Sequence, residues 1–221
     1  MTYRIGVMAT NSAASAGVGK STLAAQLSAV LQDDQFATVA IVPFAQELKR
    51  VVAWSSSLDC EQRTAWLYSE LRSWGYTDAN GYPAGLVAIA ATGAATAIQT
   101  YWKPGATKQR RVLQEVGSVF RDTLCKDVWV KRWSAVKPQV NVVIADDVRY
   151  IEETLAIDLL IGVDGSKLAL VSNGHESENA LSSLLPDVVI NVRWNVTEFD
   201  RLLDSVICRY RVATRPVRLA V

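Results

Sequence analysis

One short stretch near the N-terminus, GVGKST at residues 17–22, limits the folds that this chain can adopt. It matches the end of the pattern G-x-x-x-x-G-K-[ST], in which glycine-rich backbone and a helix N-terminus bind phosphate. An apolar run at 3–9 precedes it, and helical periodicity over 20–32 follows it. Ala14 stands where the first glycine of the pattern belongs, so we expect the loop to be longer on its N-terminal side. The sequence predicts a phosphate-binding turn between a strand and a helix.

Short apolar runs bounded by polar residues predict a five-stranded sheet. The runs cover 3–9, 36–44, 140–147, 157–163 and 187–192. Helical periodicity is clearest over 20–32, 108–124 and 195–211. In the last of these, Asn195 is predicted to cap the helix together with Glu198, three residues later. Because strands alternate with helices, we expect an α/β fold in which helices cover both faces of a mostly parallel sheet.

The segment 54–107 is much longer than the single crossover helix that two neighbouring parallel strands require. It predicts an inserted, mainly helical subregion with a turn near 79–85. The apolar run at 84–98 is too short and too rich in Ala, Gly and Thr to be expected to span a bilayer. The chain is therefore expected to be one domain that carries an insertion.

Composition disfavours several classes of protein. Lys plus Arg number 23 and Asp plus Glu number 22, so no strong overall field attracts a nucleic acid or an anionic membrane. Three widely spaced cysteines, Cys60, Cys125 and Cys208, and a single histidine indicate neither a disulfide framework nor a zinc site. The first residues lack the pattern of a signal peptide. A cytoplasmic protein with a small-molecule ligand is expected.

A second motif, VVIADDVRYIEE at 142–153, places acids directly after a predicted buried strand. Ligands of open α/β sheets bind at this end of the strands, where Asp146 or Asp147 can join the shell of a Mg²⁺ ion. Arg149 can neutralise a phosphate or the charge that develops during phosphoryl transfer. An Asp–Arg ion pair that only caps the next helix remains the alternative.

Six segments, one of them inside the second motif, follow the GKST stretch in a fixed order. They are FAQELK at 44–49, RRVLQEVGSVFRD at 110–122, DVWV at 127–130, DVRYIEE at 147–153, HESE at 175–178 and DVVINVRWNVTEFDRL at 187–202. In this order they resemble the deoxynucleoside monophosphate kinases of bacteriophages, a branch of the NMP-kinase P-loop fold. The resemblance implies a three-layer P-loop NTPase domain over 1–221. It further implies a helical NMP-binding subregion at 45–135 and a lid segment at 164–178.

The resemblance also implies an activity. The chain is expected to transfer the γ-phosphoryl group of ATP, with Mg²⁺, to the 5′-phosphate of a deoxynucleoside monophosphate (dNMP). The products are a diphosphate and ADP, and the reaction supplies DNA precursors. The implied location is the cytoplasm, that of the host cell if the protein is viral. The implied partner is the dNMP alone, without nucleic acid or membrane, and a homodimer is left open.

Site residues are assigned by the motifs and by the resemblance. The ATP site is assigned to Gly17, Val18, Gly19, Lys20, Ser21, Thr22 and Arg193, and the Mg²⁺ site to Ser21 and Asp147. The dNMP site is assigned to Lys49, Arg111, Gln114, Arg121, Trp129 and Arg149, and the catalytic role to Lys20, Asp147, Arg121 and Arg149. For Trp129, packing in the core is the alternative to stacking on a base. Asp146 is an extra acid that can share the role of Asp147.

Departures from the family pattern leave other functions open. The expected lid contains no arginine, so that Lys167 or Arg193 would have to act in its place, and Glu152 stands where the family has asparagine. The alternatives are a kinase for a modified deoxynucleotide or another small acceptor, a P-loop ATPase or GTP-binding module, and a nucleotide-binding protein without turnover. The chain has no N-K-x-D motif, which counts against a GTPase.

Overall fold

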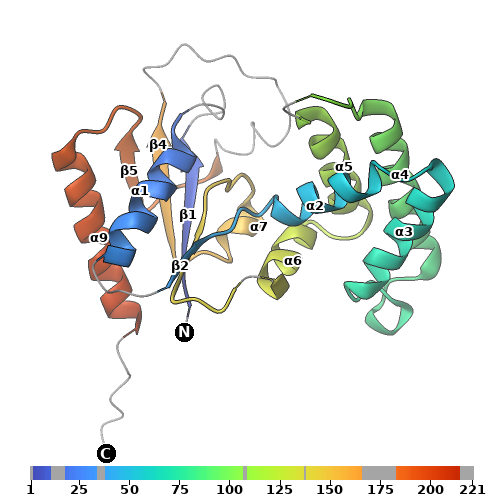
Figure 1. The fold of residues 1–221 in the computed structure, drawn as a ribbon. Helices are drawn as coiled ribbons and strands as arrows, with labels where there is room; N and C mark the ends of the chain where they lie inside the picture. The colour runs from blue at the N-terminus through green and yellow to red at the C-terminus, as the bar shows by residue number, and fades with distance from the viewer. Residues whose placement is uncertain are drawn as a thin grey trace, which may run out of the picture. The chain divides into compact units, whose positions relative to one another are not determined.

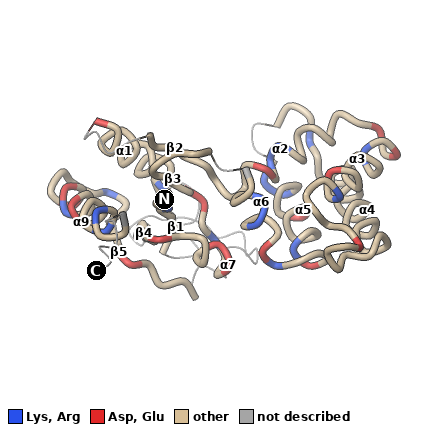
Figure 2. The backbone as a smooth tube through the Cα atoms, turned by 90° about the horizontal axis from the view of Figure 1, so that it is seen from below, with Lys and Arg blue, Asp and Glu red and all other residues tan. Residues whose placement is uncertain are grey.

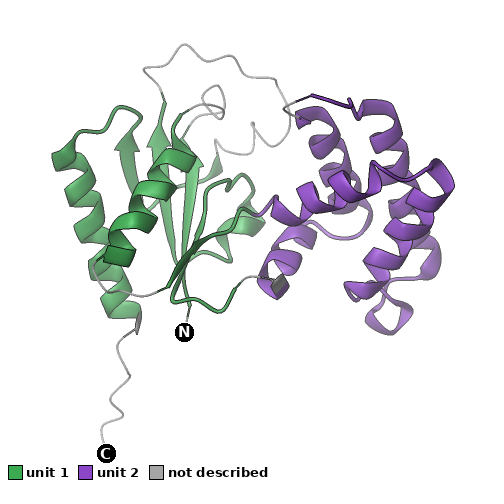
Figure 3. Ribbon diagram, in the orientation of Figure 1, with its two compact units in different colours: residues 1–43, 137–221 green, residues 44–136 purple. Residues whose placement is uncertain are grey.

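The computed structural model describes residues 2–10, 18–33, 38–106, 109–136, 138–165 and 183–214. The chain divides into two units, which we treat separately (Figure 3). Unit 1 contains residues 1–43 and 137–221, and unit 2 contains residues 44–136. Unit 2 begins one residue before and ends one residue after the subregion 45–135 expected from the sequence. Its role in binding a monophosphate stays a prediction.

Unit 1 is built on a five-stranded sheet with the order β2-β3-β1-β4-β5 (Figure 1). The strands are β1 (Tyr3–Ala9), β2 (Val39–Ile41), β3 (Val142–Ala145), β4 (Leu159–Asp164) and β5 (Val188–Asn191). All four pairings are parallel, so the five predicted strands and their parallel arrangement are confirmed. β1 and β3 are buried along nearly their whole length, as expected for strands covered on both faces.

Helices lie on both faces of this sheet and give unit 1 three layers, compatible with a Rossmann-like fold. α1 (Lys20–Asp33) and α9 (Val196–Thr214) lie on one side, and the short α7 (Ile151–Thr154) lies on the other (Figures 1 and 2). α1 buries Leu23, Ala24, Leu27 and Leu31, whose spacing is that of one helical face. The fold class predicted from the sequence is confirmed at this level.

The order of the strands decides which loops can meet. In a parallel sheet all carboxyl ends lie at one edge, and β3 is the direct neighbour of β1. The segment after β1 leads to α1, and the segment after β3 carries the two acids Asp146 and Asp147. The sheet therefore brings the start of α1 and these acids to the same edge.

Unit 2 is helical. It contains α2 (Gln46–Ser55), α3 (Cys60–Ser73), the 3₁₀ helix η2 (Asp78–Asn80), α4 (Ala84–Tyr101), α5 (Arg110–Thr123) and α6 (Val128–Val136). The apolar stretch of the sequence continues to Tyr101, so α4 has the length and mean hydropathy of a membrane-crossing helix. Its residues Val87, Ala90, Ala91, Ala94, Ala95, Ala97 and Ile98 are buried in the core of unit 2. The rings of Trp74, Phe120 and Trp129 pack together in that core.

Gly162 of β4 occupies a position where any side chain is too large. A Cβ atom there would lie 2.7 Å from Cγ2 of Thr10 and 2.8 Å from Cγ of Pro186. We expect Gly162→Ala to lower the free energy of unfolding by about 1–3 kcal/mol, because the neighbours must shift. Urea denaturation followed by circular dichroism measures this. The control is Gly85→Ala in α4, where nothing lies within 4 Å of the new methyl group; an equal loss in both variants would contradict the steric explanation.

Candidate functional site

The turn before α1 is described from Val18 onward, and residues 11–17 lie outside the described part of the chain. The predicted roles of Ala14 and Gly17 are therefore not addressed by the structure. Gly19 has φ +85°, a left-handed conformation that glycine adopts without strain. Val18 is buried, and Lys20 begins α1. The helix N-terminus that the motif predicts is therefore present.

A hydrogen bond joins α1 to the loop after β3. The hydroxyl Oγ of Ser21 donates to Oδ2 of Asp146. This pairing connects the hydroxyl of the GKST motif with an acid at the carboxyl end of the neighbouring strand. The sequence reasoning favoured Asp147 for the metal and named Asp146 as an extra acid. The structure thus identifies Asp146 as a partner of Ser21.

Backbone contacts fix the loop that carries these acids. The backbone N–H of Val148 donates to the carbonyl of Val7 in β1 at 3.3 Å. The backbone N–H groups of Arg149 and Tyr150 both donate to Oε2 of Glu153, at 2.6 and 3.1 Å. Through these bonds the carboxylate of Glu153 caps the start of α7. The Glu153 side chain is buried, at 6 % exposed. The Arg149 side chain is half-buried, and its predicted contact with phosphate stays a prediction.

The loop after β5 contributes a residue that sequence reasoning missed. Trp194 lies beside the start of α1: a Cβ on Gly19 would be 3.3 Å from Cη2 of its ring. Its Nε1 donates to Oε1 of Gln26 at 3.0 Å. The sequence offered one signal for this residue. Trp194 directly precedes the predicted cap Asn195, in the loop that follows the last predicted strand. The neighbouring Arg193 is exposed, and its predicted contact with ATP stays a prediction.

Two of the predicted acceptor-side residues are accessible in unit 2. Lys49 is exposed on α2. Arg111 is exposed on α5, and its Cζ lies 4.2 Å from the centre of the Tyr101 ring. This contact holds the guanidinium by a cation–π interaction while its N–H groups remain able to bind an anion.

Gln114 is the most unusual of the predicted residues. Its Nε2 is buried, and among the described residues it has no hydrogen-bond partner. An unpaired buried amide group costs about 1–3 kcal/mol. A ligand that accepts a hydrogen bond from Nε2 would recover this energy, as the predicted contact with a base edge requires.

Arg121 and Trp129 belong to the interior of unit 2. Arg121 is 7 % exposed, and its Nη1 donates to the carbonyl of Lys126 at 2.7 Å, which ties the end of α5 to the segment between α5 and α6. Trp129 is buried, and its ring stacks on Phe120 at a centroid distance of 5.5 Å. The ring of Trp74 meets it edge-on at 5.9 Å. Both side chains therefore stabilise the interior of unit 2. Their predicted contacts with a dNMP stay predictions.

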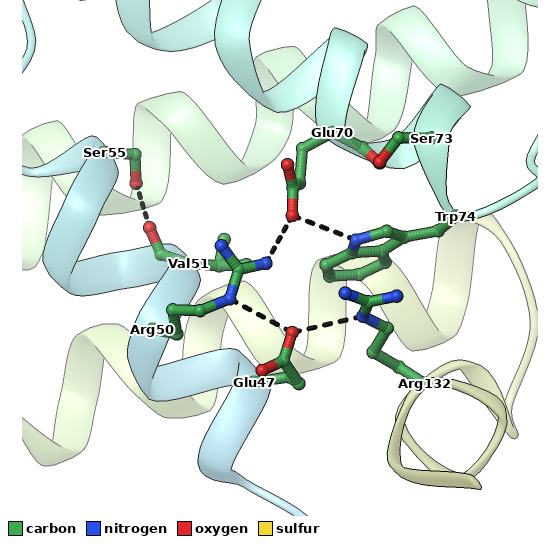
Figure 4. Close-up of polar contacts among 8 residues, drawn as sticks. All are labelled: Glu47, Arg50, Val51, Ser55, Glu70, Ser73, Trp74 and Arg132. Atoms are coloured by element: carbon green, nitrogen blue, oxygen red, sulfur yellow. Dashed lines mark hydrogen bonds and ion pairs between the residues drawn. The ribbon is translucent and has the colours of Figure 1, made fainter. Parts of the chain in front are cut away.

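A charged network that the sequence did not indicate connects three helices of unit 2 (Figure 4). Oε2 of Glu47 accepts hydrogen bonds from Nε of Arg50 and from Nε of Arg132, each at 3.1 Å. Glu70 accepts from Nη2 of Arg50 and, at 3.0 Å, from Nε1 of Trp74. Burial lowers the pKa of Arg50, but its hydrogen bonds to Glu70 and Glu47 outweigh this and raise the pKa. The network holds α2, the end of α3 and α6 together.

Removal of the central charge tests this network. Glu47 is 8 % exposed and serves two guanidinium groups. We expect Glu47→Gln to lower the free energy of unfolding by about 1–2 kcal/mol, since two charge-assisted hydrogen bonds become weaker. Thermal and urea denaturation measure the loss. The exposed Glu61→Gln is the control and should stay within about 0.5 kcal/mol of the wild type; equal effects would show that Glu47 is an ordinary surface charge.

A metal ion at the edge of the sheet would have few protein ligands. Among the described residues, no group of three or more His, Cys, Asp or Glu side chains is placed to hold one. Mg²⁺ commonly uses one or two protein oxygens and fills its shell with water and substrate phosphates. Ser21 and the adjacent acids fit this requirement. The expected lid, with Lys167 and His175, lies largely in residues 166–182, outside the described part of the chain.

Compared with known protein families, with curated proteins and with solved structures, the chain shows no match.

Proposed function

We propose that the chain is a P-loop kinase that transfers the γ-phosphoryl group of ATP to a deoxynucleoside monophosphate. The observation that carries the proposal is the hydrogen bond from Ser21 to Asp146 at the carboxyl edge of the sheet. It joins the hydroxyl of a GKST motif to an acid of the strand beside β1. Mg²⁺ in P-loop proteins is held by such a hydroxyl and such an acid.

The donor side of the reaction is assigned to unit 1. Lys20 at the start of α1 would neutralise the outer phosphates, and the backbone N–H groups at this helix N-terminus would bind phosphate oxygens. Ser21 and Asp146, with Asp147 beside them, would hold Mg²⁺, which would supply positive charge to the donor phosphates. Gly19 supports this assignment, because its left-handed conformation is typical of backbone that turns N–H groups toward an anion.

The acceptor side is assigned to unit 2. Lys49 and Arg111 are exposed cations that suit the oxygens of a monophosphate. The unpaired Nε2 of Gln114 suits an acceptor atom on a base. Because the acceptor phosphate is already ionised, the reaction needs no protein nucleophile. The bond from the γ-phosphorus to ADP breaks, the bond to the acceptor phosphate oxygen forms, and the protein positions both groups and neutralises their charge.

A coupled assay of ADP release with each of the four common dNMPs tests this function. Turnover that requires one of the dNMPs is the expected result. ATP hydrolysis that is independent of any acceptor would support an ATPase instead. ATP binding without ADP release, also with modified dNMPs, would support a nucleotide-binding protein without turnover.

A further inference from the structure

A pocket in unit 2 lies between α6 and the turn after α3. α6 lines it with Val128, Lys131, Arg132 and Ala135, whose spacing places them on one face of the helix. The other wall consists of residues 74–76 and Tyr82. The pocket has a volume of about 140 Å³, close to that of cavities that hold one benzene ring. None of its residues is assigned to ATP or to the dNMP, so it is a separate site.

The aromatic wall of this pocket is held in one conformation. Gly75 has φ +94°, which turns the chain at the end of α3. Its carbonyl accepts hydrogen bonds from Nδ2 of Asn80 at 2.7 Å and from the backbone N–H of Thr77 at 2.9 Å. The rings of Tyr76 and Tyr82 meet edge-on at a centroid distance of 4.7 Å. The wall is therefore ordered before a ligand binds, which lowers the entropic cost of binding.

Two cations border the pocket and keep donors for a ligand. Cζ of Arg132 lies 4.9 Å from the centre of the Trp74 ring, and its Nε donates to Glu47 at 3.1 Å (Figure 4). Within the described ranges, neither Nη group of Arg132 donates a hydrogen bond. Nζ of Lys131 pairs with Asp127 at 3.1 Å, and an ammonium group has three N–H donors. Both cations can therefore donate to a further anion.

We propose that this pocket binds a small anion that carries one planar ring, with the ring among the three aromatic side chains and the anionic group at Lys131 and Arg132. Aromatic rings attract one another edge-on or in offset stacks, and a guanidinium binds a carboxylate or phosphate through two parallel N–H groups. A free aromatic carboxylate and a pyrimidine nucleotide share this chemistry. The inference does not depend on the proposed function, because it uses no residue of the ATP or dNMP site.

An NMR titration of the ¹⁵N-labelled full chain with benzoate tests the site, followed at the backbone N–H of Gly75 and the indole N–H of Trp74. We expect a Kd of about 1 mM, as suits a ligand of this size. Benzamide keeps the ring without the charge, and cyclohexanecarboxylate keeps the charge without the planar ring. Each should bind at least about fivefold more weakly than benzoate. Equal binding of the three compounds, or no binding of benzoate, would overturn the proposal.

Ala135→Leu tests the position of the ligand. Ala135 is exposed and lines the pocket, so that the larger side chain takes up part of the pocket volume and leaves every charge in place. We expect benzoate binding to weaken by about tenfold or more, because the ring and the leucine cannot share this volume. Ser134→Leu is the control, since Ser134 is also exposed but does not line the pocket. Unchanged binding in Ala135→Leu would overturn the site.

Lys131→Gln tests the contact with the anionic group, and Lys126→Gln is its matched control. Each lysine pairs with an aspartate four residues earlier, and their side chains are 54 % and 56 % exposed. We expect Lys131→Gln to weaken benzoate binding about three- to tenfold and to leave benzamide binding unchanged, since only the charged ligand loses a partner. Lys126→Gln should bind benzoate as the wild type does. Equal effects of the two substitutions on benzoate would overturn the contact.

A titration with dCMP separates the two sources of the ligand. Because dCMP is also an expected acceptor, its effect is compared between the wild type and Ala135→Leu. A shift at Gly75 that disappears in Ala135→Leu identifies a pyrimidine nucleotide as the ligand, and one that persists arises outside the pocket and leaves an aromatic carboxylate. Benzoate binding without acceptor-dependent ADP release would overturn the proposed function alone, and ADP release without benzoate binding would overturn this inference alone.

Discussion

Replacement of Lys20 by alanine is expected to reduce acceptor-dependent ADP release by about 10²–10³-fold, the size of effect found when one preorganised group that stabilises developing charge is removed from an active site. Lys20 is the first residue of α1, so its ammonium group lies at the positive end of the helix dipole. Substitution there removes a charge from the place where the transferred phosphoryl group would be held. The initial rate at saturating ATP and dNMP measures the effect.

Lys103→Ala is the matched control for Lys20→Ala. Lys103 is exposed and lies in the described part of the connection between α4 and α5. Its loss removes the same charge from the molecule, so it should leave the rate within about twofold, as expected of a surface substitution. Activity of Lys20→Ala at the wild-type level would contradict the assignment of the GKST stretch to the donor phosphates.

Asp146→Asn is expected to lower kcat by about a hundredfold or more and to raise the Mg²⁺ concentration needed for half-maximal activity. The amide has the shape of the carboxylate and can still accept the hydrogen bond of Ser21, but it lacks the charge that the metal requires. A titration of activity against Mg²⁺ measures both changes. Thermal denaturation checks that the variant folds as the wild type does.

Asp147→Asn is the natural companion, because the two acids are adjacent at the end of β3. The contact of Asp146 with Ser21 leads us to expect the larger shift in Mg²⁺ requirement from Asp146→Asn. The resemblance to the phage kinases favours Asp147. If Asp147→Asn shifts the Mg²⁺ requirement more, Asp147 is the metal ligand and Asp146 positions Ser21.

Local patterns of the sequence were sufficient for the strands, for the helix after the GKST turn and for the Asn195 cap. Apolar runs identify buried strands because burial of both faces of a parallel sheet removes polar residues from the strand. The cap is also local, since Asn195 and Glu198, three positions apart, each accept a hydrogen bond from the backbone N–H of the other. For these features the sequence neighbours are also the structural neighbours.

The choice between Asp146 and Asp147 was beyond this reasoning. The two residues follow the same strand, and nothing in the local pattern indicates that Asp146 accepts a hydrogen bond from Ser21. Trp194 was missed for a related reason: its contact with Gly19 joins the two ends of the sequence through the order of the sheet. Such contacts depend on strand order, which periodicity does not determine.

Arg121 shows a third limit of prediction from the sequence. A charged residue in a helix usually indicates a solvated face, and the resemblance placed this one in contact with substrate. In the structure its aliphatic part is buried and its guanidinium reaches a backbone carbonyl beyond the end of α5. Arginine can do this because its long side chain carries five donors to distant acceptors. No spacing rule predicts such a contact.

Unit 2 is one uninterrupted segment with its own buried core, joined to the rest of the chain only near residues 43–44 and 136–137. Unit 1 holds every residue that we assign to the donor. Of the residues that we assign to the acceptor, all but Arg149 lie in unit 2. Under the proposed function, an exchange of the single segment 44–136 would replace Lys49, Arg111 and Gln114 on the acceptor side and leave Lys20, Ser21 and Asp146 on the donor side unchanged.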